Sequence, residues 1–251
     1  MIVSTWEGRV AAAHAAVFAS EMAGRGVDVT VVQCADPLAA VSSGEADAAY
    51  TLMNLLPMDT GDLVIAAVLR RMPHRYVAVP RLDGVAAVRY GGRCWDEDYF
   101  EVEGDDMDCI DMVTEGGADC ALVSSLTLEV LDLDVESEDI DGVTAPGMGA
   151  GAVVCRKDDS GTVSVFRGFD DLTTRLEVTA ERGLLSLMGA DVDHPIYADA
   201  VLDGFQMLLK AENYGFMGQY RFGEKLLPVD FVMDEVLGLA EFLTGKRDEI
   251  I

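Results

Sequence analysis

The sequence has little positive charge. Its 251 residues include 18 lysines and arginines against 45 aspartates and glutamates, which gives a formal net charge of −27 at pH 7. Phosphate groups are bound by clustered lysine and arginine, so this shortage argues against nucleic acid as a partner. The acidic excess is typical of a solvated surface suited to solubility or a salty cytoplasm, and a cation-binding face is the alternative.

Long apolar runs and paired cysteines are also missing. No run of eighteen apolar residues occurs, and the first residues lack the basic and apolar regions of a signal peptide. We therefore expect no membrane association and a cytoplasmic location. The cysteines are odd in number and lack Cys-x-x-Cys spacing, which favours reduced thiols over a disulfide framework. They are Cys34, Cys94, Cys109, Cys120 and Cys155.

The usual motifs of metal and nucleophilic chemistry are absent. His14, His74 and His194 are isolated, and no HExxH, phosphate-loop or dinucleotide fingerprint is present. The acidic run 131–142 has some of the spacing of a calcium loop, but it lacks glycine at its sixth position and an acid at its twelfth. We interpret this run as a solvated connection and expect no metal site.

Half of the residues are hydrophobic, enough for a core in two or three small domains. The chain begins with alternating strand and helix patterns, which predict a mostly parallel sheet. Strands are expected at 2–5, 27–33 and 46–52, with a helix at 10–23 and a short helix after Asp36.

Similar patterns continue through the rest of the chain. In the middle we expect strands at 64–69, 76–79, 85–88 and 118–123, and a helix at 108–115. A helix capped by Asp171 or Thr173 should run to about Leu187 with one apolar face. A hairpin over 195–212 that turns at Asp203-Gly204, a strand within 219–222 and an amphipathic helix at 229–243 complete the prediction.

The stretch TAPGMGAGAVVCRKDDS at 144–160 organises the chain. Its proline and glycines suit a close-packed backbone crossing, and 149–155 has the pattern of a buried strand. The stretch resembles the PAPGQGAL-I-CR-DD segment of the hydroxymethylbilane synthase (porphobilinogen deaminase) family. Residues 44–57 resemble that family's GEADIAVHSMKDLP, residues 116–123 its G-YDAIILA, and residues 179–182 its TAER.

The resemblance implies an α/β fold of three domains. The first two domains of the family are similar to type 2 periplasmic binding proteins, and the third is α+β. Carried onto this sequence, domain 1 comprises 1–80 with 144–166, a shortened domain 2 comprises 81–143, and domain 3 comprises 167–251. The stretch 144–160 should then cross from the second domain into a central strand of the first.

The family's chemistry depends on residues that this sequence replaces. The family holds a dipyrromethane cofactor through a thioether to a cysteine and stabilises cationic pyrrole intermediates with an aspartate. Ungapped alignment from the nearest motifs places Val192 at the cysteine position and Leu55 at the aspartate position. Asn54 stands at the lysine before that aspartate.

The arginines that bind substrate carboxylates in the family are replaced as well. Trp6, Glu103 and Cys109 stand at arginine positions, and Met148 stands at the glutamine of the crossing motif. Arg89 or Arg93 is a possible substitute for one arginine of a pair. The candidate cleft residues are therefore Trp6, Asn54, Leu55, Arg89, Arg93, Glu103, Cys109, Met148 and Val192.

These replacements imply a degenerate family member without synthase activity, catalytic residues or dipyrromethane. They also predict a cleft that is acidic and poor in arginine. Two alternatives stay open: a binding protein for a small, cationic ligand, and a protein–protein scaffold or regulator. Because one fold hosts many functions, the resemblance by itself does not choose among them.

Overall fold

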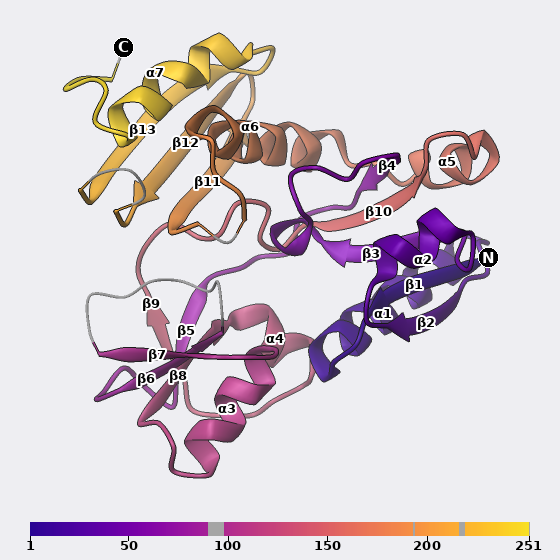
Figure 1. Ribbon diagram of the computed structural model, residues 1–251, viewed down its shortest axis with the longest axis horizontal. Coiled ribbons are helices and arrows are strands. Elements are labelled where there is room, and N and C mark those ends of the chain that lie inside the picture. Colours follow the sequence, from indigo (N-terminus) through magenta and orange to yellow (C-terminus); the bar gives the residue numbers. More distant parts are fainter. Residues whose placement is uncertain (90–97, 193, 216–218, 251) are drawn as a thin grey trace.

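A computed structural model describes residues 1–89, 98–192, 194–215 and 219–250 of the chain. The fold is mixed α/β. Two five-stranded sheets each combine parallel and antiparallel strands, and a three-stranded antiparallel sheet lies near the C-terminus. Figure 1 shows these sheets as three separate bodies, with the first and third joined by a long helix.

The first sheet has the strand order β2-β1-β3-β10-β4. Its strand β1 is parallel to β2 and β3, whereas β10 is antiparallel to β3 and β4. The strands β1 to β4 therefore run in one direction, which confirms the expected mostly parallel sheet, and only β10 is reversed, because the chain returns from the second body in the opposite direction. The strands are β1 (Ile2–Trp6), β2 (Thr30–Cys34), β3 (Ala48–Leu52), β4 (Leu63–Val68) and β10 (Gly151–Arg156).

Helices cover both faces of the first sheet. On one face, Phe18 of α1 (Arg9–Gly24) and Phe166 of α5 (Ser160–Arg167) are fully buried in one apolar cluster. On the other face, Val41 of α2 (Pro37–Ser43) is buried in a second cluster. Helix α5 was not predicted, because its eight residues offer a short apolar pattern between polar caps.

The second sheet has the strand order β7-β6-β8-β5-β9. Two features differ from the sequence prediction. β5 belongs to this sheet, although the expected boundary assigned it to 1–80, and β9 forms within the acidic run that was interpreted as a connection. The elements are β5 (Tyr76–Val79), β6 (Ala86–Arg89), β7 (Tyr99–Val102), β8 (Cys120–Ser124), β9 (Glu138–Ile140), α3 (Asp106–Thr114) and α4 (Ser125–Val130).

The third sheet packs against two helices and has the order β11-β12-β13. The predicted hairpin and the apolar face of α6 are confirmed, and Asp171 is the residue that caps this helix, accepting from the Thr174 backbone N at 2.9 Å. The last helix begins at Met233 rather than at 229. The elements are α6 (Leu172–Met188), β11 (Ile196–Asp203), β12 (Gln206–Asn213), β13 (Arg221–Pro228) and α7 (Met233–Leu243).

The crossing stretch enters the first sheet as β10, between β3 and β4, which confirms the predicted central strand. Two glycines before β10 have positive φ angles, 80° at Gly147 and 78° at Gly149. A Cβ atom at Gly147 would lie 2.6 Å from the Cβ of Met53, and one at Gly149 would lie 2.6 Å from the carbonyl oxygen of Met72. These turns therefore require glycine for both conformation and space.

We expect Gly149→Ala to lower the free energy of unfolding by about 2 kcal/mol or more, because alanine is strained in the left-handed region and its methyl group would collide with backbone. Gly24→Ala is the control, since Gly24 lies at the end of α1 with nothing within 4 Å of an added Cβ. That change should be neutral or stabilising. Urea unfolding measures both, and equal stabilities would contradict the prediction.

Candidate functional site

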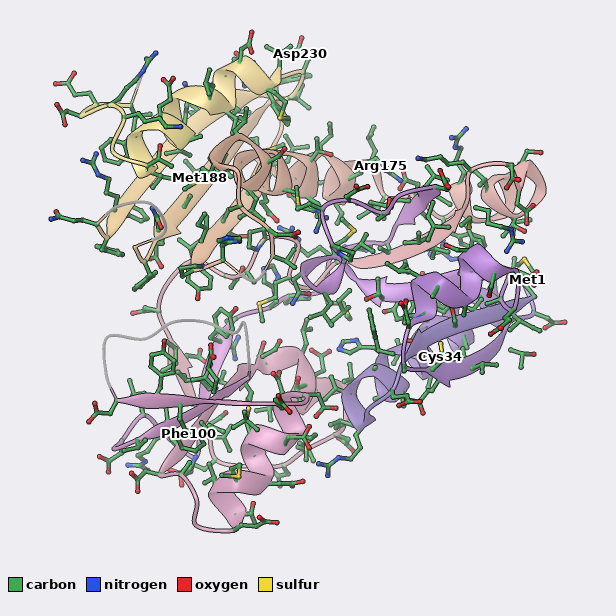
Figure 2. The ribbon with its side chains drawn as sticks, viewed as in Figure 1. Met1, Cys34, Phe100, Arg175, Met188 and Asp230 are labelled. Atoms are coloured by element: carbon green, nitrogen blue, oxygen red, sulfur yellow. The ribbon has the colours of Figure 1, made fainter. Side chains whose placement is uncertain are left out.

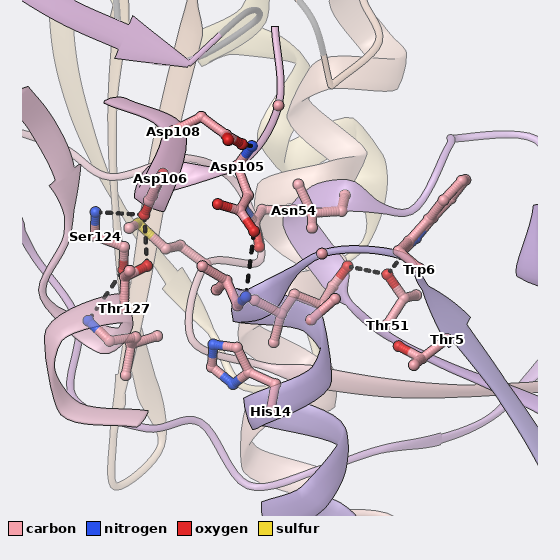
Figure 3. A pocket seen from close by; sticks show the side chains of 18 of the residues that line it. Thr5, Trp6, His14, Thr51, Asn54, Asp105, Asp106, Asp108, Ser124 and Thr127 are labelled. Atoms are coloured by element: carbon pink, nitrogen blue, oxygen red, sulfur yellow. Dashed lines mark hydrogen bonds between the residues drawn. The ribbon is translucent and has the colours of Figure 1, made fainter. Parts of the chain in front are cut away.

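A cavity of about 470 Å³ lies between the first and second sheets. The first body contributes the ends of β1 and β3 and the start of α1, and the second contributes the start of α3 and the end of β8. Figure 3 shows the two sides facing each other, with Trp6 and His14 on one side and Asp106 and Ser124 on the other.

Four of the candidate residues line this cavity. They are Trp6, Asn54, Leu55 and Met148. The indole Nε1 of Trp6 donates to Thr51 Oγ1 at 3.1 Å, which fixes the ring at the end of β1. Asn54 and Leu55 belong to the 3₁₀ turn η1 (Met53–Leu55), which follows β3 directly.

Three other candidates lie outside the lining of this cavity. Cys109 is fully buried in the core between α3 and the second sheet, because it follows the start of the helix by about one turn and faces the sheet. Glu103 is exposed, and Val192 is in the loop between α6 and β11. Arg93 lies outside the described residues, and of Arg89 only the backbone in β6 is described.

The acidic residues of the cavity also cap helix α3. Asp105 Oδ1 accepts from the Met107 backbone N at 2.8 Å, and Asp108 Oδ2 accepts from the Asp105 backbone N at 2.7 Å, which completes a capping box. Asp106 Oδ2 accepts from Ser124 N at 2.9 Å and from Thr127 Oγ1 at 2.6 Å. The closely spaced aspartates were visible in the sequence, but their capping role was missed.

Two contacts join α1 to α3 across the mouth of the cavity. The Val10 backbone N, in the first turn of α1, donates to Asp105 Oδ2 at 3.2 Å. Arg9 forms an ion pair with Asp111, and this hydrogen-bonded partner raises the pKa of Arg9 above its usual value. The carboxylate of Asp105 therefore lies at the positive end of α1, where an anionic ligand would otherwise be attracted.

His14 and Asn54 each have one buried polar atom without a hydrogen-bond partner among the described residues. Among the described residues, neither His14 Nδ1 nor Asn54 Oδ1 has a hydrogen-bond partner, and both residues line the cavity. His14 is only 3% exposed. Burial lowers the pKa of His14 to about 4, so its imidazole is neutral at pH 7.

The charge lining the cavity is of one sign. Glu7, Asp105, Asp106 and Asp108 line it, and no lysine or arginine does so within the part of the chain that the structure describes. Tyr50 adds no charge, because burial raises the pKa of its hydroxyl. Such a lining concentrates negative potential in a partly enclosed space.

The turn that carries Asn54 and Leu55 is held by Arg182. Its Nη1 donates to the carbonyl oxygens of Met53 and Leu56, both at 2.8 Å, and its Nη2 donates to that of Pro57 at 2.9 Å. Burial lowers the pKa of Arg182, yet an arginine stays protonated at any ordinary pH. Arg182 therefore positions the turn that carries Asn54 and Leu55, but it does not itself line the cavity.

Glu181, the neighbour of Arg182, joins all parts of the crossing region and is fully buried. It accepts from Arg71 Nη1 at 2.7 Å, Arg71 Nη2 at 2.8 Å, Gly147 N at 2.6 Å and Ala200 N at 2.8 Å. Burial raises the pKa of Glu181, and the guanidinium of Arg71 opposes that shift. Glu181 and Arg182 belong to the segment 179–182 that resembles the family's TAER, and their contacts are structural.

Helix α6, which carries both residues, links the first and third bodies (Figure 2). Near its start, Arg175 Nε donates to Asp170 Oδ2 at 2.7 Å, and Asp170 Oδ1 accepts from Val68 N of β4 at 2.7 Å. At its end, Met188 is buried in the core of the third body. The cavity is thus supported by a helix from outside the two sheets that enclose it.

The sequence is similar to porphobilinogen deaminases over much of its length. It is 30% identical to that of Acidothermus cellulolyticus over 223 residues, which cover 79% of this chain and 66% of the relative. The chain belongs to the porphobilinogen deaminase family. It is a divergent member, because no protein-family model matches it.

Shorter matches are found to other porphobilinogen deaminases. The protein of Mycobacterium leprae is 40% identical over 95 residues, 36% of this chain and 30% of the relative. The probable porphobilinogen deaminase of Nitrosopumilus maritimus is 29% identical over 119 residues, 47% of this chain and 36% of the relative. The chain therefore aligns with about a third of each of these two relatives.

Solved structures have a weaker similarity to this chain. The methionine-binding protein MetQ matches with a TM-score of 0.45 and 15% identity, over 67% of this chain and 88% of that one. The protein YhfZ of Shigella flexneri matches with a TM-score of 0.40 and 11% identity, over 74% of this chain and 95% of that one. At these TM-scores the similarity carries no functional argument.

Two other kinds of site are absent from the described part of the chain. None of its helices combines the length and the apolar character needed to cross a membrane. No three histidine, cysteine, aspartate or glutamate side chains are placed there to hold one metal ion.

Proposed function

We propose that this member of the porphobilinogen deaminase family lacks hydroxymethylbilane synthase activity. The observation that carries the proposal is the position of Leu55, which lines the cavity at the place that the motif alignment assigns to the family's aspartate. An alkyl side chain supplies no charge to stabilise a cationic pyrrole intermediate. The amide of Asn54 beside it has no charge either.

The cysteines do not fit a thioether-bound dipyrromethane. Val192, at the aligned position, has no sulfur. Among the described residues, no cysteine lines the cavity, and Cys109, Cys120 and Cys155 are fully buried. Burial raises the pKa of the Cys155 thiol to about 12, which keeps it protonated and unreactive at pH 7. No step of a reaction is therefore assigned to that cofactor.

The charge of the cavity also opposes a substrate with two carboxylates. Its described lining contains four acids and no arginine or lysine. Carboxylates are bound by bidentate guanidinium groups, and like charges in a confined site repel. We propose that this protein is cytoplasmic. It is a relative of an enzyme of tetrapyrrole synthesis, but it does not itself carry out that synthesis. A role as a scaffold or regulator stays a hypothesis beside this one.

We expect the purified protein to have the mass of its sequence and to consume no porphobilinogen. Intact-mass spectrometry and an assay of porphobilinogen consumption measure these results. The variant that carries both Val192→Cys and Leu55→Asp should fold and still be inactive, because restoring a thiol and a carboxylate restores no group that binds substrate carboxylates.

A catalytically active porphobilinogen deaminase from a relative, assayed in parallel, is the positive control for substrate and assay. A dipyrromethane adduct on any cysteine would overturn the proposal that the cofactor is absent. Steady hydroxymethylbilane production by the double variant would show that the substrate still binds, and the argument from the charge of the cavity would then be wrong.

A further inference from the structure

We propose that the cavity between the first two sheets binds a small organic cation with N–H donors, such as a primary ammonium, through His14 Nδ1 and Asn54 Oδ1. This goes beyond the loss of synthase activity, which says only what the cavity does not do. Three observations support it. Two buried acceptor atoms have no partner among the described residues, the charged residues of the described lining are all acidic, and the N-terminus of α1, which would attract an anion, is already occupied by the carboxylate of Asp105.

The first observation concerns His14. Polar atoms buried in proteins almost always have a hydrogen-bond partner, so an exception points to a group supplied from outside. His14 is 3% exposed and lines the cavity, yet its Nδ1 has no partner among the described residues. In a neutral imidazole one ring nitrogen donates and the other accepts, and we assign Nδ1 as the acceptor, so that the missing group is a donor.

The second acceptor comes from a different element. Asn54 belongs to η1, beyond the end of β3, whereas His14 is on α1. Its Oδ1 is buried, has no partner in the described part of the chain, and belongs to another residue of the cavity lining. Arg182 holds the backbone of this turn through Met53 and Leu56, so the amide is presented from a rigid support.

The other two observations are electrostatic. The described lining has four carboxylates without a lysine or arginine, so the cavity attracts positive charge. The N-terminus of α1, which would favour an anion, already receives the carboxylate of Asp105. A cationic ligand with N–H donors satisfies both acceptors, whereas a carboxylate satisfies neither. The volume of about 470 Å³ suits a small molecule.

Calorimetric titration of the full chain with three probes tests this inference. The probes are 1,4-diaminobutane, its bis-trimethylammonium analogue and glutarate. The first two have the same charge, but only the first has N–H donors. At an ionic strength of roughly 0.15 M, surface attraction is screened within about 8 Å, so the difference between these two probes reports the acceptors. We expect the diamine to bind at least about tenfold more tightly than its analogue, and glutarate not to bind.

Matched variants identify the site. His14→Phe and Asn54→Leu should each weaken diamine binding by about tenfold or more, because each removes an acceptor for a charged donor. Glu7→Gln, at the rim of the cavity, should weaken it by a smaller factor. Asp158→Asn removes an exposed charge in the turn after β10, outside the lining, and should leave binding unchanged.

Several results would overturn the inference. They are equal affinity for the diamine and its analogue, no heat of binding with the diamine, or unchanged affinity in both acceptor variants. If His14→Phe fails to fold, Asn54→Leu and the comparison of the two probes on the unmodified chain still test whether the cavity binds the diamine through its acceptor atoms. None of these results depends on whether porphobilinogen is consumed.

Discussion

Glu181→Leu should lower the free energy of unfolding by about 3–5 kcal/mol, because it leaves a buried guanidinium without its main partner. Arg71 is largely buried, and its remaining carboxylates lie farther away, with Asp199 at 3.3 Å and Glu177 at 3.8 Å. The change also removes the acceptor of the Gly147 and Ala200 backbone N–H groups. Denaturant unfolding measures the loss.

Glu21→Leu is the matched control for Glu181→Leu. Glu21 is also a helical glutamate that pairs with an arginine, Arg25 at 2.8 Å, but both side chains are exposed. Such pairs contribute at most about 1 kcal/mol. The double change Arg71→Leu with Glu181→Leu should recover part of the lost stability, since the buried guanidinium is removed together with its main partner. Equal effects of Glu21→Leu and Glu181→Leu would contradict the structural role of Glu181.

Acidification from pH 7 to pH 4 should destabilise the protein by up to about 3 kcal/mol through His14 alone. Burial lowers the pKa of His14 from 6.5 to about 4. Between pH 6.5 and pH 4, His14 is therefore mostly protonated in the unfolded chain and mostly neutral in the folded protein. The stability from this group is fully present above pH 6.5 and is lost as the pH falls towards 4, at about 1.4 kcal/mol for each unit of pKa difference.

His14→Phe isolates this contribution. Both proteins titrate the same carboxylates, so the difference between their free energies of unfolding reports His14. We expect the free energy of unfolding of the variant to rise relative to that of the unmodified protein as the pH falls from 6.5 to 4. Above pH 7 the difference should not change with pH. A difference that is constant from pH 7 to pH 4 would mean that His14 is solvated in the folded protein.

Local sequence was enough to predict most of the regular elements. The apolar face of α6 and the alternation of β11 and β12 follow from side-chain periodicity, which is local information. The crossing at Gly147 and Gly149 was predictable because proline fixes φ and glycine permits positive φ angles in any context. The direction of β10 was not, since its antiparallel pairing with β3 and β4 depends on where the chain returns from.

Short elements escaped prediction for a different reason. β9 has three residues, Glu138–Ile140, and two of them are acidic, so only its pairing with β5 makes it a strand. The hydrogen bonds of a sheet edge need a neighbouring strand, which sequence patterns do not reveal. In the same way, Cys109 was expected in the cleft by alignment, and only the rotation of α3 places it in the core.

By itself, the sequence determined that the chain is strongly acidic and that Val192 and Leu55 stand where the motif alignment places the family's cysteine and aspartate. Those are properties of single residues and of composition. Only the tertiary structure decided that His14 of α1 and Asn54 of η1 line one cavity with Asp105 of the second body. These residues are far apart in the chain, and packing between separate sheets, which has no local sequence signature, brings them together.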